Sequence, residues 1–153
     1  MPTLEERLQR LENIAEIRRL KIIYAQYCDN NYEPGPLASL FTENAVWEMG
    51  PLGRFEGRQA IHDFFADVSK RFTFALHYMC GHVIDIAPSG TEATGTWYIF
   101  EAATIDGRAM FVAATYEDRY QKINGKWLFD QVKVSPAFMT PYESGWVKER
   151  MAG

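Results

Sequence analysis

Residues 92–135, EATGTWYIFEAATIDGRAMFVAATYEDRYQKINGKWLFDQVKVS, carry the strongest structural signal in the chain. Apolar and polar residues alternate along this segment, as they do in a strand with one buried face. Asp106-Gly107 and Asn124-Gly125 interrupt the alternation, and both dipeptides suit a two-residue type I′ hairpin turn. The segment therefore predicts three antiparallel strands, at Glu92–Ile105, Arg108–Lys122 and Lys126–Ser135.

A fourth strand is expected immediately before this segment, at Phe72–Ile86, with the turn between the two strands at Ser89-Gly90. The second half of the chain is thus predicted to be an antiparallel meander. Its strands exceed the usual length of about 5 or 6 residues, so bulges and strong curvature are expected. Gly81 and Gly95 are the predicted bend points.

Helices dominate the first half of the predicted structure. Thr3 and Glu6 form a capping-box pattern that opens a long amphipathic helix, whose apolar positions are predicted at Leu4, Leu8, Leu11, Ala15, Leu20, Tyr24 and Cys28. Prolines and a glycine predict a loop over Asp29–Pro36. A short helix at Leu37–Phe41, short strands at Ala45–Met49 and Arg54–Glu56, and a helix at Arg58–Ser69 are expected to follow.

Helices followed by a long sheet indicate an α+β fold. We expect a cone-shaped, strongly curved antiparallel β-sheet, with the N-terminal helices closing an apolar pocket. Residues 1–153 are expected to form a single domain. The C-terminal tail, residues 136–153, is rich in aromatic side chains and is predicted to cover the pocket or a subunit interface.

Composition excludes several classes of function. The 153 residues carry a formal net charge of −4, so neither nucleic acid nor an anionic membrane surface is an expected partner. Ala109–Ala114 is the longest apolar stretch, and it is too short to span a membrane. The charged N-terminus does not resemble a signal peptide, which predicts a cytoplasmic location. Cys28 and Cys80 are interpreted as small buried hydrophobic residues.

Metal and nucleotide motifs are absent from the sequence, so we expect neither a metal nor another cofactor. His77 and His82 fall on opposite faces of a regular strand and would form a metal pair only if Gly81 bulged. His62 lies off the apolar stripe of its helix and is predicted to be a surface residue.

His77 and Asp29 are the first candidates for chemistry. His77 lies in an otherwise apolar strand, where an unpaired imidazole would cost about 1–3 kcal/mol, so it needs a partner. Asp29 ends the long helix, where a nearby imidazolium would offset the unfavourable helix dipole. Paired, they would form a general-base dyad. Alternatively, His77 is a core histidine bonded to a backbone carbonyl, and Asp29 is a solvated loop residue.

Glu101 and Tyr24 are further candidates. Glu101 shares a strand face with Trp97 and Ile99, and a carboxyl group in such surroundings has a raised pKa. On the convex face it would instead be a solvated charge. Tyr24 follows Leu20 by one helical turn and offers a phenol that could polarise a carbonyl. It could equally be a core tyrosine with its hydroxyl group at the edge.

The sequence resembles the SnoaL-like group of the nuclear transport factor 2-like (cystatin-like) superfamily over roughly Leu4 to Val134. The similarity rests on Tyr24 and Asp29 and on these segments: Leu11-Glu12, residues 16–21 (EIRRLK), 40–47 (LFTENAVW), 55–61 (FEGRQAI), Leu76-His77, 93–98 (ATGTWY), 116–120 (YEDRY) and 125–127 (GKW). Within this group the chain is most similar to bile-acid 7α-dehydratase, and more distantly to scytalone dehydratase and hexachlorocyclohexane dehydrochlorinase.

The resemblance implies functions for the candidate residues. His77 and Asp29 take the positions of a His-Asp dyad, Tyr24 that of a helix tyrosine, and Glu101 that of a cavity aspartate. An arginine of the dehydrochlorinase has no clear counterpart, which weakens dehydrohalogenation as an inference. The expected activity is a cofactor-independent lyase or isomerase acting on a hydrophobic cyclic hydroxy-carbonyl compound, such as a steroid, terpenoid or polyketide. Candidate substrate-binding residues of the apolar wall are Trp47, Met49, Phe65, Met110, Val112 and Phe138.

Two further expectations concern partners. The alternative function is a non-catalytic ligand-binding or assembly module, such as the small subunit of a dioxygenase. In either case the open face of the sheet is expected to expose apolar residues, which predicts a homo-oligomer. The resemblance implies a trimer, as in the dehydratases, or a dimer, as in other branches of the group.

Overall fold

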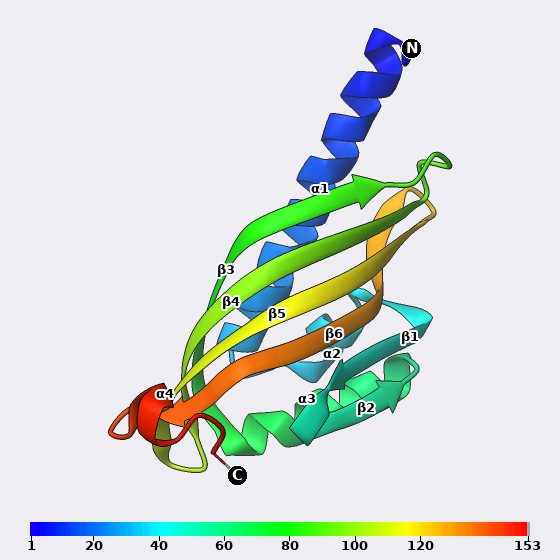
Figure 1. Cartoon of the computed structure of the whole chain (residues 1–153). Helices are drawn as coiled ribbons and strands as arrows, with labels where there is room; N and C mark the ends of the chain where they lie inside the picture. Colours follow the sequence, from blue (N-terminus) through cyan, green and yellow to red (C-terminus); the bar gives the residue numbers. More distant parts are fainter. Residues whose placement is uncertain (153) are drawn as a thin grey trace.

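The structure is a computed structural model that describes residues 1–152 (Figure 1). A long helix opens the chain, and most of the second half is sheet. The elements in order are α1 (Leu4–Asp29), α2 (Pro34–Ala38), β1 (Phe41–Met49), the 3-10 helix η1 (Gly50–Leu52), β2 (Gly53–Glu56), α3 (Arg58–Arg71), β3 (Phe72–Ile86), β4 (Glu92–Ile105), β5 (Arg108–Ile123), β6 (Lys126–Pro141) and α4 (Gly145–Lys148).

The strands form one six-stranded sheet in the order β2-β1-β6-β5-β4-β3. The fold is therefore α+β, as predicted, but the sheet is mixed. β1 runs parallel to β6, with Trp47 opposite Val132, whereas every other neighbouring pair is antiparallel. The prediction of a wholly antiparallel sheet is wrong at this pair, because segments so far apart in the chain leave no turn signal between them.

The predicted hairpins are confirmed. Asp106, Gly107, Asn124 and Gly125 all have positive φ, between 49° and 79°, which type I′ turns require. β3 and β4 begin and end at the predicted residues, and β5 ends one residue later than expected.

The prediction that β6 ends at Ser135 is wrong, because the strand continues to Pro141. Pro136 has no backbone N–H, and the pairing of β5 with β6 shifts register between Ala113 and Ala114, opposite this proline. Part of the predicted C-terminal tail is therefore strand. The rest includes α4, where Trp146 stacks on Phe138 with ring centroids 5.1 Å apart.

Two predictions for the first half also need correction. The short helix covers Pro34–Ala38 rather than Leu37–Phe41, because proline is tolerated in a first helical turn. Leu4, Leu8 and Leu11 do not share the buried stripe of α1. They are exposed, while Ile17, Leu20 and Tyr24 face the core.

Of the two predicted bend points, only Gly81 is a bulge. It has a φ of +60°, and the pairing of β3 with β4 shifts register between Cys80 and Val83. Gly95 pairs regularly and instead allows a close approach, since a Cβ atom there would lie 2.9 Å from the Tyr120 hydroxyl oxygen. Cys80, beside the bulge, is exposed, so its interpretation as a buried residue is wrong, whereas Cys28 is buried.

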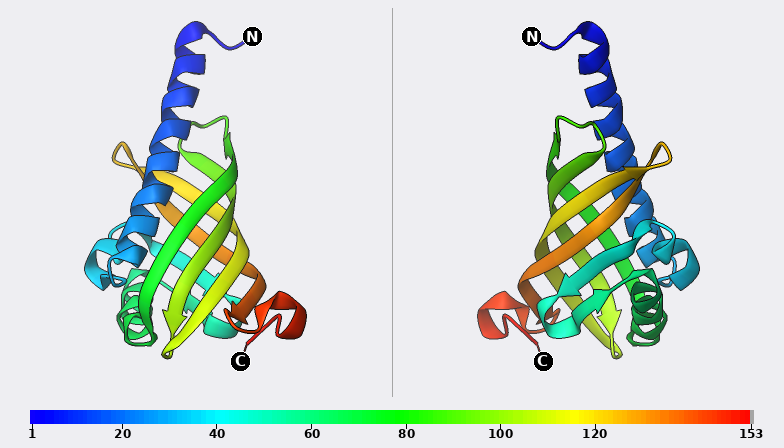
Figure 2. Two further views of the ribbon diagram at one scale, coloured as in Figure 1. Left: turned by 90° about the vertical axis from the view of Figure 1, so that its left-hand side faces the viewer. Right: turned by 90° about the vertical axis from the view of Figure 1, so that its right-hand side faces the viewer.

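The helices α1 and α3 cover one face of the sheet, and the core lies between these two layers (Figure 2). The first turns of α1 extend beyond the sheet (Figure 1). This arrangement brings the end of α1 close to the middle of β3 and β4. A buried ion pair crosses the same interface, with Lys21 Nζ 2.7 Å from Asp118 Oδ2.

Candidate active site

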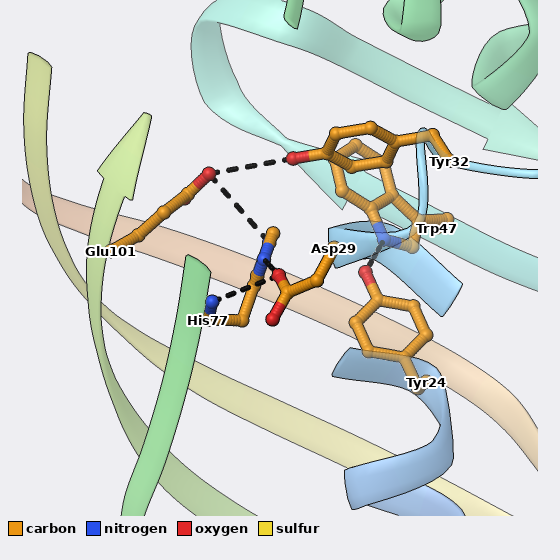
Figure 3. Close-up of polar contacts among 6 residues, drawn as sticks. All are labelled: Tyr24, Asp29, Tyr32, Trp47, His77 and Glu101. Atoms are coloured by element: carbon orange, nitrogen blue, oxygen red, sulfur yellow. Dashed lines mark hydrogen bonds and ion pairs between the residues drawn. The ribbon is translucent and has the colours of Figure 1, made fainter. Parts of the chain in front are cut away.

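Asp29 and His77 form a close pair where the last residue of α1 meets the middle of β3 (Figure 3). Asp29 Oδ1 lies 2.6 Å from His77 Nδ1, and the same oxygen accepts the backbone N–H of His77 at 2.9 Å. The aspartate thus binds both the ring and the strand that carries it. The His77 side chain is only 5% exposed, whereas that of Asp29 is 27% exposed.

This contact determines which ring nitrogen of His77 is free. An ionised carboxylate can only accept hydrogen bonds, so Nδ1 carries the proton that points at Asp29. In the neutral imidazole, Nε2 then keeps its lone pair. Nε2 lies on the side of the ring near Glu101, 3.7 Å from Glu101 Oε1. The arrangement is chemically suited to accepting a proton at Nε2, with Asp29 stabilising the imidazolium that results.

Glu101 faces His77 from the neighbouring strand. The two residues are direct partners in the register of β3 and β4, and the Glu101 side chain is buried. Burial raises the pKa of this carboxyl group, while the nearby His77 and the hydroxyl group of Tyr32 act in the opposite direction. Glu101 is therefore a carboxyl group able to hold or release a proton in an apolar setting.

Tyr32 is a site residue that the sequence analysis missed. Its hydroxyl group donates to Glu101 Oε1 at 3.4 Å, and its ring lies edge-on to the His77 ring with centroids 5.9 Å apart. Tyr32 has a φ of 50° in the loop after α1, so the chain turns back there and sends the ring inward. The available signal was a large aromatic residue within an otherwise polar loop.

Tyr24 lies one turn and a half before Asp29 on α1, with its ring in the core (Figure 3). Its hydroxyl oxygen accepts the indole N–H of Trp47 at 3.0 Å, which leaves the phenol proton for another acceptor. Burial raises the pKa of Tyr24 well above its usual value, so the group stays a neutral donor.

These polar groups face a small apolar cavity of about 40 Å³. Tyr24, Tyr32, His77 and Glu101 all line it, as do four of the predicted wall residues: Trp47, Met49, Phe65 and Val112. Met110 and Phe138 are not among the lining residues. Met110 is buried elsewhere in the core, and Phe138 packs against Trp146. The volume corresponds to roughly three water molecules.

The other histidines lie away from the cavity. Despite the bulge at Gly81, His82 lies against the Trp97 ring, with centroids 4.8 Å apart. His62 is 38% exposed and contacts Asp63 at the surface. Among residues 1–152, no three or more His, Cys, Asp or Glu side chains are grouped so as to hold a metal ion. Within the same range, no helix is long and apolar enough to cross a bilayer.

Residues 9–133 match the SnoaL-like domain family, which covers most of the chain and includes every polar group of the cavity. The chain belongs to the SnoaL-like family. Its fold is accordingly the nuclear transport factor 2-like, or cystatin-like, fold. The resemblance to the SnoaL-like group, seen in the sequence, is confirmed.

Solved structures agree with this fold. The SnoaL-like domain is similar to a candidate scytalone dehydratase from Novosphingobium aromaticivorans, at 24% identity and a TM-score of 0.80, over 88% of this chain and 90% of that one. A hexachlorocyclohexane dehydrochlorinase from Novosphingobium barchaimii matches at 23% identity and a TM-score of 0.78, over 88% of this chain and 92% of that one. A candidate aromatic ring hydroxylase from Novosphingobium aromaticivorans matches at 21% identity and a TM-score of 0.79, over 86% of this chain and 94% of that one.

Proposed function

We propose that this SnoaL-like domain is a cofactor-independent lyase or isomerase, of the dehydratase type, acting on a hydrophobic cyclic hydroxy-carbonyl compound. The observation that carries the proposal is the 2.6 Å contact between Asp29 and His77 at the wall of an apolar cavity. Two of the structural relatives are named for elimination reactions, a dehydrochlorinase and a candidate dehydratase, which supports the same class of chemistry.

The proposed reaction begins with proton removal. His77 Nε2 takes a proton from the carbon next to the substrate carbonyl, and the electron pair of that C–H bond moves into an enolate. Asp29 stabilises the imidazolium, and the Tyr24 hydroxyl group donates to the enolate oxygen. The substrate carbonyl is the electron sink in this step.

In the elimination step, the electron pair of the enolate re-forms the carbonyl group and expels the leaving group. The enolate collapses to form the carbon–carbon double bond, and the β C–O bond breaks. The leaving hydroxyl group takes a proton from Glu101, whose raised pKa favours the protonated form, and departs as water. Proton transfer from the His77 imidazolium back to Glu101, across the 3.7 Å between Nε2 and Oε1, restores both groups. In an isomerisation the proton would return to a different carbon instead.

Access to the cavity is proposed to lie between η1 and α3. Leu52, Phe64, Val68 and Phe72 line both the cavity and a groove on the outer surface, so these side chains form a wall shared by the two. Because the cavity volume is about 40 Å³, movement of this wall would be needed to make room for a ring-sized substrate.

A hydroxy-ketone panel of steroid, terpenoid and aromatic polyketide type tests the proposal. The purified protein is incubated with each compound in D₂O, and NMR and mass spectrometry follow deuterium exchange next to the carbonyl and loss of water. We expect turnover by the native protein and a loss of about 100-fold or more in His77→Gln, since general-base catalysis contributes roughly 10²–10⁴-fold. Asp29→Asn is expected to lose rate in the same direction.

His62→Gln is the matched control, because it makes the same substitution at a surface histidine. It should keep the native rate. Full activity of His77→Gln would contradict the assignment of His77 as the base. Exchange without loss of water would favour isomerisation over elimination.

A second candidate function is a non-catalytic ligand-binding or assembly module, which the small cavity volume favours. In that case the panel compounds would bind or fail to bind without any deuterium exchange, and His77→Gln would change only affinity.

We also propose that the domain forms a homo-oligomer through the sheet face that points away from α1. Apolar side chains are exposed there, among them Leu76, Tyr78, Tyr98 and Phe100. Tyr78 and Phe100 are direct cross-strand partners, so the exposed surface is continuous between β3 and β4. A partner subunit would cover this surface. The mass of the native protein in solution, compared with that of Phe100→Ser, tests this proposal.

A further inference from the structure

The outer face of α1 carries a second apolar stripe that no part of the described chain covers. Leu4, Leu8, Leu11 and Ile22 are 79%, 54%, 64% and 43% exposed. Together with the exposed Ala15, these residues recur at alternating spacings of four and three residues, and only Arg18 interrupts the apolar series. This spacing is typical of a helix that packs against another helix. At 100° per residue this stripe lies on the side of α1 opposite Ile17, Leu20 and Tyr24, which face the core.

The stripe is a preformed helical surface. The capping box at Thr3 is complete, with Thr3 Oγ1 accepting the N–H of Glu6 at 3.1 Å and Glu6 Oε2 accepting the N–H of Thr3 at 2.6 Å. The first turns extend beyond the sheet in both views of Figure 2, so a second helix can approach them. The SnoaL-like family match begins only at residue 9, so Leu4 and Leu8 precede it.

The charged residues beside the stripe indicate which partner covers it. One edge of the stripe carries acids near its start, at Glu5 and Glu12, and a base near its end, at Arg19, whereas the opposite edge carries Arg7. If two copies of α1 align in opposite directions, Glu5 of one copy meets Arg19 of the other, twice across the two-fold axis. Leu4 then packs on Ile22, Leu11 on Ala15, and Leu8 on the aliphatic stem of Arg18.

A parallel alignment and a membrane fit the stripe less well. In a parallel pair Arg18 would face Arg18 of the other copy, and Glu5 and Arg19 would not meet. Acids and bases are nearly balanced between residues 4 and 22, so the helix lacks the excess of positive charge by which amphipathic helices bind anionic lipid.

We propose that two copies of this chain pair through the outer stripe of α1 in an antiparallel arrangement. The shared length, residues 4–22, is about 27 Å at the helical rise of 1.5 Å per residue. This contact is separate from the sheet face, so it would join two domains, or two oligomers formed through that face.

Sedimentation over a range of concentrations tests the pairing. Leu8→Glu should raise the dissociation constant of this contact by about tenfold or more, because it places a carboxylate against the partner stripe. Gln9→Glu is the matched control, since it adds the same charge to the neighbouring exposed residue off the stripe. It should leave the constant unchanged. Equal dissociation constants for the two variants would overturn the proposal. So would a native protein that does not associate, or one whose association Leu8→Glu does not weaken.

Charge exchange tests the direction of the pair. Glu5→Lys and Arg19→Glu should each weaken association, and the double variant should restore it. Failure of the double variant to recover overturns the antiparallel arrangement. Glu12 lies near its own counterpart across the axis, so Glu12→Gln should tighten the pair. Binding of the native protein, but not of Leu8→Glu, to vesicles containing phosphatidylglycerol, without self-association, would also overturn the proposal.

Discussion

The Glu101 carboxyl group gives the site a pH dependence that can be measured without a substrate. Its pKa in the folded protein is raised above the usual value of 4.5 by burial, so the folded state holds the proton more tightly than the unfolded chain does. Ionisation of Glu101 therefore lowers stability as the pH rises from the unfolded value through the folded one. Glu101→Gln, which cannot ionise, escapes this loss.

We accordingly expect Glu101→Gln and the native protein to differ least at acidic pH. The stability of the variant relative to the native protein should increase between the unfolded pKa of 4.5 and the raised folded pKa of Glu101, and stay constant above it. Urea unfolding followed by tryptophan fluorescence between pH 4 and 8 checks this. A constant difference across that range would show that residue 101 has the same affinity for its proton in both states.

Tyr32→Phe provides a second test at the same residue pair. The Tyr32 hydroxyl group donates to Glu101 Oε1 and lowers the pKa of that carboxyl group. Its removal should raise the folded pKa of Glu101 further, so the stability difference between Tyr32→Phe and Tyr32→Phe/Glu101→Gln should continue to grow to higher pH, and become larger, than in the native background. The same pH dependence in both backgrounds would mean that the 3.4 Å contact does not act on the carboxylate.

Sequence reasoning could place Asp29, His77 and Glu101 as candidates because each is a polar residue in unusual surroundings. It missed Tyr32, whose contribution depends on a loop residue with positive φ that sends its ring inward. It placed Met110 and Phe138 in the cavity wall because both are apolar residues of the right region. Their actual neighbours follow from the curvature and register of long strands, which a single sequence does not determine.

At the scale of elements, the bulge in β3 depends on Gly81. This residue has a φ of +60°, and a Cβ atom there would lie 2.6 Å from Tyr98 Cδ2. Gly81→Ala should therefore cost the backbone penalty of about 1–2 kcal/mol for a left-handed conformation, and more because of the tyrosine ring. Thermal and urea unfolding measure the total loss.

Gly90→Ala separates the two contributions. Gly90 also has positive φ, at +71°, but no atom lies within 4 Å of its added Cβ. Gly90→Ala should show only the backbone penalty. Equal losses at the two sites would mean that the Tyr98 side chain, which is exposed, moves away without cost.

Local signals explain which elements could be predicted. The turns at Asp106-Gly107 and Asn124-Gly125 and the cap at Thr3 are encoded by neighbouring residues, and all three are present. The pairing of β1 with β6 joins distant segments, so nothing near Trp47 indicates Val132 as its partner. The length of β6 beyond Pro136 depends in the same way on a shift in the facing strand.

At the scale of the whole molecule, a buried ion pair ties α1 to the sheet. Lys21 and Asp118 have side chains with no exposed area, and the Lys21 ammonium lies 3.5 Å from the centroid of the Tyr116 ring. Burial lowers the pKa of Lys21 and raises that of Asp118. The Tyr120 hydroxyl group also donates to Asp118 at 2.8 Å, and it accepts the indole N–H of Trp97.

Lys21→Met should therefore destabilise the domain by about 3–5 kcal/mol, because it leaves the Asp118 carboxylate buried without its cation. Lys21→Met/Asp118→Leu should recover much of the loss. Lys70→Met is the control at an exposed pair with Asp67, where about 0–1 kcal/mol is expected. Chemical denaturation measures all three variants. A loss at Lys21 as small as that at Lys70 would contradict a desolvated pair.

The direct pairing of His77 with Glu101 has a consequence for the order of folding. Both residues belong to one hairpin, so closing the turn between β3 and β4 brings the imidazole opposite the carboxyl group early, through contacts local in sequence. Asp29 is 48 residues from His77 and arrives only when α1 docks. We therefore expect the hairpin of β3 and β4 to form before the contact between Asp29 and His77 when the chain refolds, so that the two candidate residues meet only after the helix has packed on the sheet.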